Sequence, residues 1–334
     1  VVTESLEIKK LVLADAAPHI GPEAWLSSNT SGLSLAAMGE ALPADLRPRF
    51  FGSHFFNPPR YMKQIELIPG PDTDPGVLDR VSDFGSLRLG KGVVRAKDTP
   101  NFVANGIGVH SILQTVAVMA DMGLTTEEVD ALTGPAIGRP NTATFKLADL
   151  VGLDTFVHVA DNLHPLIPDD EARDAFLCPD YLREMVKKGL LGRKSGGGFY
   201  RMEKTAEGRK FFTIDVESME YREKQKAKFG ELDAARPVED LGERLRQLAF
   251  GKGKAGQAIW KMLAASFSYS AMRLGEICDQ AAEIDQAVCW GFNWELGPFE
   301  VWDTLGFRKV TERMREDGLP LPPWVDALYD SGAE

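Results

Sequence analysis

His54 and Glu66 stand twelve positions apart, each beside a short apolar run. Residues 50–51 predict a short buried strand that stops at Gly52, so that His54 begins a loop, which the prolines after it keep out of a helix. Residues 65–68 predict a second strand, and two neighbouring strands would bring the imidazole and the carboxylate together. A carboxylate fixes the tautomer of an imidazole and favours its protonated form, as a general base requires. The pair indicates an enzyme, although spacing alone leaves a structural role open.

The elements that must position this pair lie before residue 100. The chain opens in an apparent strand, and further strands are expected at 24–26, 50–51, 65–68 and 92–94, with helices over 33–42 and 77–89. Strands separated by helices imply βαβ units and a mostly parallel sheet. Ligands of such sheets bind at the carboxyl ends of the strands. The polar residues 27–31 and 53–58 fall at such ends.

From residue 101 onward the pattern becomes helical. An apolar helix face ends at Gly123, and Thr125 with Glu128 predicts a capping box that starts the next helix. Residues 201–239 are polar and charged, and we interpret them as a linker with some helix.

The helical part contains an internal repeat. Residues 128–130 recur as 283–285, and residues 149–153 recur as 303–307. The expected domains are therefore residues 1–99, a first helical domain at 100–200, the linker at 201–239 and a second helical repeat at 240–334.

Composition excludes several classes of protein. The balance of 38 basic and 49 acidic residues gives a net charge of −11, which argues against nucleic-acid binding and requires a local basic patch for any polyanionic ligand. Three cysteines indicate a reducing, cytoplasmic compartment. No apolar run approaches the roughly 20 residues of a membrane span. No histidine, cysteine and aspartate cluster has metal-ligand spacing, so no metal is expected.

Four motifs occur in order: SNTSG at 28–32, SHFFNP at 53–58, KDTPNFVAN at 97–105 and LGRKSGGGFY at 191–200. Together they resemble the L-3-hydroxyacyl-CoA dehydrogenase family of fatty-acid β-oxidation, in its form with a tandem pair of C-terminal domains. The resemblance covers essentially the whole chain. It implies oxidation of an (S)-3-hydroxyacyl-CoA to the 3-oxoacyl-CoA with NAD as cofactor.

The resemblance also assigns roles to residues. His54 matches the catalytic base and Glu66 its partner carboxylate, while Ser31 and Asn105 match residues that hydrogen-bond the substrate hydroxyl. Asn29, Ser31 and Asn57 are the expected contacts to the cofactor. A helix cap or a turn is the alternative for Ser31 and Asn105, and Asn57 is expected to hold its loop rather than to touch substrate.

A dinucleotide is normally held by a glycine fingerprint between a strand and a helix. The match at residues 251–256 follows a charged, helix-patterned segment, so we interpret it as a loop between helices. The resemblance places the genuine fingerprint upstream of Val1. The expected fold is thus an α/β partial Rossmann-type domain, lacking its N-terminal part, followed by two all-α repeats of the C-terminal domain.

Two other functions stay open. One is a non-catalytic acyl-CoA-binding or scaffolding fragment of a multifunctional β-oxidation protein, with an enoyl-CoA hydratase domain or subunit as partner. The other is a dehydrogenase of small hydroxy acids, which would use a lysine base, yet residues 106–123 contain no lysine. The repeat predicts a monomer that imitates a dimer within one chain, with a homodimer as the alternative.

Overall fold

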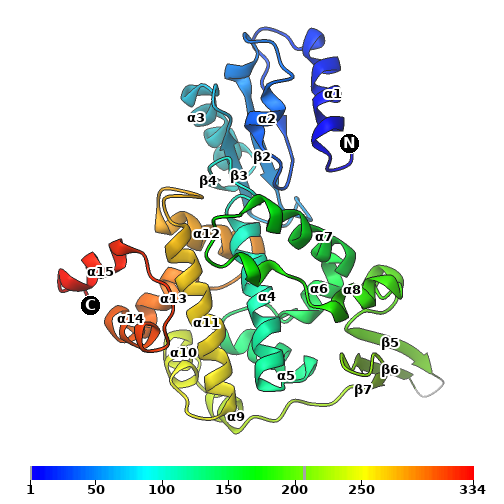
Figure 1. The fold of residues 1–334 in the computed structure, drawn as a ribbon, viewed down its shortest axis with the longest axis vertical. Helices are drawn as coiled ribbons and strands as arrows, with labels where there is room; N and C mark the ends of the chain where they lie inside the picture. Colours follow the sequence, from blue (N-terminus) through cyan, green and yellow to red (C-terminus); the bar gives the residue numbers. More distant parts are fainter. Residues whose placement is uncertain (1, 206–207) are drawn as a thin grey trace. The chain divides into compact units, whose positions relative to one another are not determined.

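The computed structural model describes residues 2–205 and 208–334 (Figure 1). It divides into two compact units, each of which draws on two stretches of the chain. The α/β unit comprises Val1–Gly108 and Arg273–Asn293, and the helical unit comprises Val109–Met272 and Trp294–Glu334.

The α/β unit contains a four-stranded sheet in the order β1-β2-β3-β4. β1 and β2 are parallel, β2 and β3 antiparallel, and β3 and β4 parallel. The sheet is therefore mixed rather than mostly parallel. Its elements are α1 (Leu6–Ala16), β1 (Leu26–Ser28), α2 (Leu35–Gly39), β2 (Phe50–Phe55), β3 (Gln64–Pro69), α3 (Pro75–Asp83), β4 (Gly92–Arg95), the start of α4 (Ala104–Met122) and α12 (Ala281–Phe292).

Two local expectations for this unit are wrong. Among the described residues, those before α1 form no strand. β2 also does not stop at Gly52 but continues to Phe55, so His54 lies in a strand and not in a loop. Gly52 is needed there for space, because a Cβ at this position would lie 3.0 Å from Ile68 Cδ1 and 3.3 Å from Leu35 Cδ2. The sequence predicts that Gly52 ends the strand, but in the structure Gly52 is the position where α2 packs closely on the sheet.

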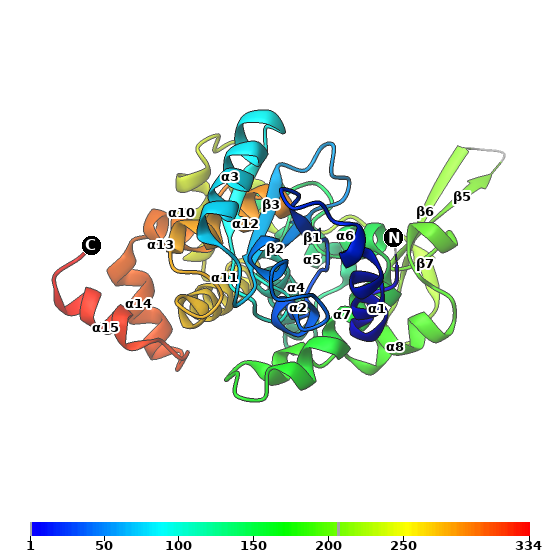
Figure 2. The same cartoon turned by 90° about the horizontal axis from the view of Figure 1, so that it is seen from above.

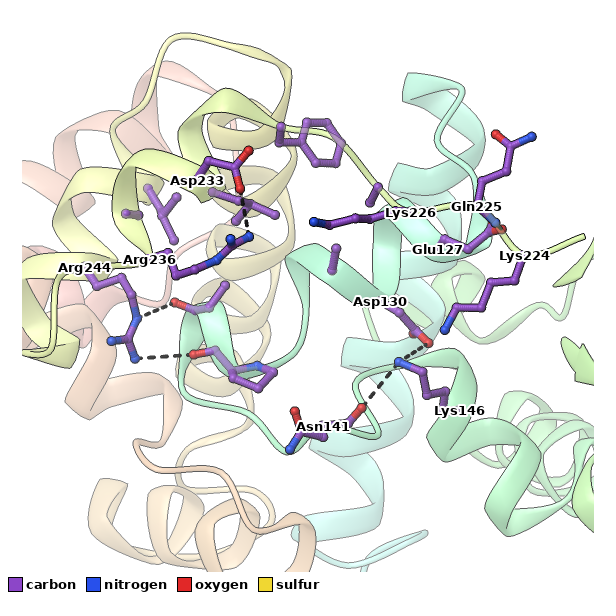
Figure 3. Close-up of a pocket in the computed structure, with 18 of the residues that line it drawn as sticks. Glu127, Asp130, Asn141, Lys146, Lys224, Gln225, Lys226, Asp233, Arg236 and Arg244 are labelled. Atoms are coloured by element: carbon purple, nitrogen blue, oxygen red, sulfur yellow. Dashed lines mark hydrogen bonds and ion pairs between the residues drawn. The ribbon is translucent and has the colours of Figure 1, made fainter. Parts of the chain in front are cut away.

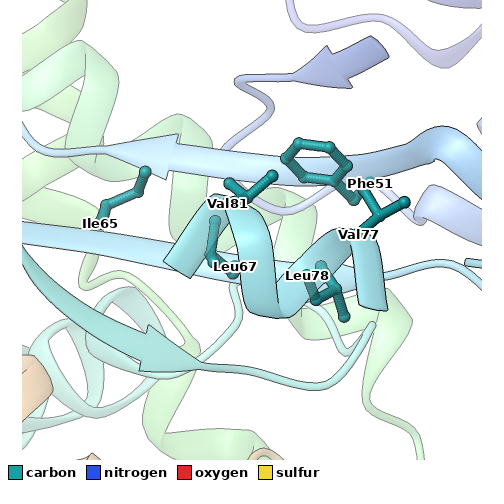
Figure 4. Packing of buried hydrophobic residues seen from close by; sticks show 6 residues of the cluster. All are labelled: Phe51, Ile65, Leu67, Val77, Leu78 and Val81. Atoms are coloured by element: carbon teal, nitrogen blue, oxygen red, sulfur yellow. The ribbon is translucent and has the colours of Figure 1, made fainter. Parts of the chain in front are cut away.

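Side chains of β2 and β3 point alternately to the two faces of the sheet, so the two faces carry different kinds of residue. One face carries a buried apolar cluster against α3, shown in Figure 4 and made of Phe51, Ile65, Leu67, Val77, Leu78 and Val81. The opposite face carries His54 and Glu66, which are directly paired in the antiparallel register. The chemistry-bearing side chains thus share one face of a sheet whose other face is core.

α12 completes the α/β unit from a distant part of the sequence. Trp290 of α12 covers Gly92 at the start of β4, where a Cβ would lie 2.2 Å from the indole ring. Just before α12, the Ile277 carbonyl accepts a hydrogen bond from the Lys97 N–H at 2.8 Å. This segment, which was expected within the second helical repeat at 240–334, therefore belongs to the α/β unit.

The helical unit is not purely helical. Where the sequence predicts a linker, three strands form an antiparallel sheet, and β5 and β6 extend from the helices of the same unit as a ribbon (Figure 2). Its elements are α5 (Thr126–Leu132), α6 (Phe145–Val151), α7 (Leu153–Leu163), α8 (Asp180–Lys187), β5 (Tyr200–Thr205), β6 (Gly208–Ile214), β7 (Tyr221–Glu223), α9 (Gly230–Ala235), α10 (Leu241–Ala249), α11 (Lys254–Arg273), α13 (Pro298–Leu305), α14 (Phe307–Glu316) and α15 (Pro323–Asp330). The predicted fold of two all-α repeats is wrong for two reasons. A three-stranded sheet follows the first expected repeat, and α12, which was expected in the second repeat, belongs to the α/β unit.

The capping box at the start of α5 is confirmed, with Thr125 accepting from the Glu128 N–H and Glu128 accepting from the Thr125 N–H. A second polar contact fixes the start of β5. The buried Asp149 carboxylate of α6 accepts the N–H groups of Phe199 and Tyr200, both at 2.8 Å. Gly198 must lack a side chain here, because a Cβ would lie 2.1 Å from Asp149 Oδ1.

Candidate active site

The site is built on the paired strands β2 and β3. His54 Nδ1 lies 2.6 Å from Glu66 Oε2, and the two side chains are 5% and 0% exposed. An ionised carboxylate accepts only, so Nδ1 carries the proton and donates it to Glu66. That tautomer leaves His54 Nε2 able to accept a proton from a substrate.

Glu66 is held at both of its oxygens. Oε1 accepts the backbone N–H of Ala104, in the first turn of α4, at 2.8 Å. With Oε2 on His54, the carboxylate has no freedom to rotate without losing a buried hydrogen bond. Glu66 therefore orients the imidazole rigidly.

Aromatic rings surround the imidazole. The ring centroids of Phe56 and Phe102 lie 4.7 and 5.7 Å from that of His54. The ring of Phe292, at the end of α12, packs edge-on against Phe56 at 6.3 Å. Such a wall keeps water away from the pair and strengthens its electrostatic interaction.

The structure brings Ser31 and Asn105 into contact with each other. The Asn105 side-chain amide donates to the Ser31 carbonyl at 3.5 Å. Asn105 directly follows Ala104, the residue that binds Glu66. A chain of two hydrogen bonds thus links the loop after β1 to the His54–Glu66 pair through the start of α4.

The asparagines expected at the cofactor have different surroundings. Asn29 Oδ1 accepts the N–H of Phe55 at 2.9 Å, so its side chain joins the ends of β1 and β2 next to His54. Asn57 is exposed and precedes a cis peptide bond to Pro58. Asn29 therefore has a positioning contact in addition to any contact with a ligand.

One residue of the site escaped sequence reasoning. The Glu4 carboxylate accepts the Ser31 N–H at 2.8 Å and the Thr30 hydroxyl, and it pairs with Lys9 Nζ at 3.0 Å. Burial by itself raises the pKa of Glu4, but the hydrogen bonds from Thr30, Ser31 and Lys9 outweigh it and leave that pKa lowered. Glu4 thus stays ionised and orders the loop that carries Ser31. No spacing signal connects residues 27 positions apart.

Residues 2–205 and 208–334 contain no group of three or more histidine, cysteine, aspartate or glutamate side chains that could hold a metal ion. None of their helices is both long enough and apolar enough to cross a membrane.

Two family models match the chain. Residues 1–99 match the NAD binding domain of 3-hydroxyacyl-CoA dehydrogenase, and residues 102–202 match the C-terminal domain of the same enzyme. The chain belongs to the 3-hydroxyacyl-CoA dehydrogenase family. The match over 1–99 corrects the expectation that the N-terminal part of this domain is lacking. The single C-terminal match, ending at residue 202, also speaks against the tandem repeat.

Relatives agree with this membership. The chain is 43% identical over its full length to a probable 3-hydroxyacyl-CoA dehydrogenase of Bacillus subtilis, of which it covers 42%. It is 32% identical over 97% of its length to a putative fatty acid oxidation complex trifunctional enzyme of Rickettsia felis, of which it covers 44%. The chain therefore spans less than half the length of these two relatives. The crystal structure of the Escherichia coli 3-hydroxybutyryl-CoA dehydrogenase shares the fold, with a TM-score of 0.72 and 20% identity over 99% of this chain and 81% of that one.

Proposed function

We propose that the protein containing this chain oxidises (S)-3-hydroxyacyl-CoA to 3-oxoacyl-CoA with NAD in fatty-acid β-oxidation. The observation that carries the proposal is the buried His54–Glu66 pair at 2.6 Å, in a chain of this family. A protein that only binds or scaffolds acyl-CoA has no need of an imidazole held in one tautomer.

His54 is the proposed base and acts through Nε2. It takes the proton of the 3-hydroxyl, and the Glu66 carboxylate stabilises the positive charge that the imidazole then carries. Ser31 and Asn105 are proposed to hydrogen-bond the same hydroxyl, which orients C3 for reaction. NAD, when bound, supplies the acceptor for the hydride that leaves C3.

The residues at the ends of β1 and β2 fit the reacting end of such a cofactor. They offer the polar side chains of Asn29, Ser31 and Asn57 beside an apolar imidazole pocket, and we propose these three as cofactor contacts. The match at 251–256 does not fit a dinucleotide fingerprint, because it follows the helix α10 and not a strand before it enters α11.

The proposal extends to the setting of the protein. All three cysteines are free, as a reducing, cytoplasmic compartment requires. Because one relative is a putative trifunctional enzyme, we propose an enoyl-CoA hydratase domain or subunit as partner. The assembly is proposed as a monomer or a homodimer.

The test is oxidation of NADH that depends on acetoacetyl-CoA, measured with the parent chain and with His54→Ala. We expect the substitution to lower kcat by about 100-fold or more, the contribution of a positioned general base. The exposed His158 provides the matched control, and His158→Ala is expected to retain full activity. A folded chain that binds both ligands and oxidises no NADH would contradict the enzyme and favour the scaffold.

A further inference from the structure

The ribbon of β5 and β6 has one face on which apolar and cationic side chains are separated. In the antiparallel register Met202 lies opposite Phe211, and Lys204 lies opposite Arg209. Residues two positions apart on a strand point to the same face, so these four side chains share one face of the ribbon. The apolar pair is nearer to the helices of the unit, and the cationic pair is nearer to the end of the ribbon (Figure 2).

The cationic pair weakens the ribbon that carries it. Like charges directly opposite each other on two strands destabilise the strand pairing, and both Lys204 and Arg209 are exposed. In the part of the chain that the structure describes, no carboxylate oxygen lies within 4 Å of either charged group. An anionic group bound between the two side chains would remove their repulsion.

The apolar pair forms a surface beside these charges. Met202 and Phe211 are 44% and 50% exposed, although both are large hydrophobic side chains. Because the Cβ atoms of directly opposite residues lie about 5 Å apart, the two side chains form one continuous surface. Tyr200, two residues before Met202 on the same face, extends it toward the helices. Contiguous exposed apolar surface is typical of a binding site.

This face lines a cavity of about 600 Å³, to which Met202, Arg209 and Phe211 contribute. The opposite wall comes from α6 and from the turn before β5, through Asp149 and Gly196 among others. Every residue that lines the cavity belongs to the helical unit. The volume is that of a small-molecule site. A walled cavity accommodates a single molecule better than the flat surface of a membrane.

The other cations of the cavity act on carboxylates of the protein. Within residues 2–205 and 208–334 they are Lys146, Arg193, Arg201 and Lys224. Lys146 pairs with Asp130 at 3.4 Å, and Figure 3 shows Lys224 directed toward the same carboxylate. Arg201 pairs with Glu203 at 2.8 Å. The charge of Arg193 opposes the rise in the pKa of Asp149. The ligand is therefore assigned to Lys204 and Arg209.

We propose that this face binds an amphiphile that has an anionic head group and an apolar chain, with the head on Lys204 and Arg209 and the chain along Met202 and Phe211. An ammonium and a guanidinium bind a carboxylate or a phosphate head through charge-assisted hydrogen bonds. None of these residues belongs to the His54–Glu66 pair or its surroundings. The inference thus goes beyond the proposed function, because it adds a second binding site.

The test is calorimetric titration of the full chain with decanoate and with decyl phosphate, which also separates the two head groups. Decanol lacks the charge and hexanoate has a shorter chain, so each should bind at least about tenfold more weakly than decanoate. We expect Lys204→Gln/Arg209→Gln to raise the Kd for the tighter of the two anionic probes by about tenfold or more. Met202→Ala/Phe211→Ala should weaken decanoate by about tenfold and hexanoate by less.

The matched control, Lys187→Gln/Lys252→Gln, neutralises two exposed lysines that do not line the cavity. It should keep the Kd within about twofold of the parent. Circular dichroism spectra that match the parent verify that each variant is folded.

Three results would overturn the site: equal losses in both lysine-containing double variants, decanol that binds as tightly as decanoate, or a parent chain that binds neither anionic probe. In the last case, binding to phosphatidylglycerol vesicles would assign the face to a membrane surface. The titrations contain no NAD and no CoA ester, so their failure leaves the dehydrogenase proposal standing.

Discussion

Each of the two carboxylate oxygens of Glu66 makes a different hydrogen bond. One oxygen faces His54 Nδ1 and the other holds the Ala104 N–H. The same carboxylate therefore orients the His54 imidazole and connects the strand pair to the start of α4, beside Asn105. A substitution that keeps the shape of the side chain and removes its charge separates electrostatics from geometry.

Glu66→Gln is expected to lower kcat by about 100-fold or more, with KM for acetoacetyl-CoA within about threefold, because the neutral amide cannot stabilise a charged imidazole. Steady-state assays of NADH oxidation measure this. The exposed Glu23→Gln in the same unit is the control. Equal activity of both variants would contradict the role of the carboxylate.

Asp149 gives the helical unit a pH dependence. Burial raises the pKa of its carboxyl from 3.8 to about 6, and the N–H groups of Tyr200 and Phe199 only partly oppose this. The folded chain then binds the proton more tightly than the unfolded chain does. This contribution to stability is complete below pH 4 and is lost as the pH rises through 6, by at most about 3 kcal/mol.

Urea unfolding between pH 4 and 7 measures that loss. Asp149→Asn has no carboxyl to titrate, so its free energy of unfolding should fall less over this range than that of the parent chain. Since Asn accepts only one of the two N–H groups fully, the comparison uses the change with pH and not the absolute stability. If the free energy of unfolding changed with pH equally in the two chains, Asp149 would not be the group responsible for the pH dependence.

At the scale of elements, the antiparallel pairing of β2 and β3 brings the active pair together. It puts His54 opposite Glu66 and Phe55 opposite Ile65, so the buried polar pair and the core side chains alternate between the faces. This pairing could be predicted from the apolar runs and the twelve-residue gap. The extent of β2 could not, because Gly52 is demanded by the approach of Leu35 and Ile68, which no local pattern contains.

Gly52→Ala should lower the free energy of unfolding by about 1–3 kcal/mol, the typical result of overpacking a filled core. Denaturant titration followed by tryptophan fluorescence measures it. Gly21→Ala is the control, since no atom lies within 4 Å of its added Cβ. A variant as stable as the control would mean that α2 can retreat from the sheet.

At the scale of the whole molecule, short stretches of sequence recur, but the recurring stretches have different surroundings in the fold. Residues 283–285 resemble residues 128–130, yet α12 packs on β4 through Trp290 while α5 stays in the helical unit. Likewise, the charged stretch after residue 200 reads as a linker because its strands are short and mostly exposed. Only tertiary packing decides such cases.

Trp290→Ala should lower the free energy of unfolding by about 2–4 kcal/mol, and amide hydrogen exchange in β4 should accelerate, because the substitution uncovers Gly92. Hydrogen exchange read by mass spectrometry locates the effect within the α/β unit. Trp25→Ala removes an indole that is 41% exposed in the same unit and should change neither quantity appreciably. Unchanged exchange in β4 would show that α12 is dispensable.

Because α12 is the last part of the α/β unit to be translated, the sheet of this unit is synthesised before the helix that covers β4. Residues 109–272 must all be translated between β4 and α12. At about 5–20 residues per second this takes on the order of 10–30 s. During that interval β4 has no covering helix, because α12 has not yet been translated. A nascent chain arrested before residue 281 would therefore present an uncapped sheet, the kind of surface that chaperones retain.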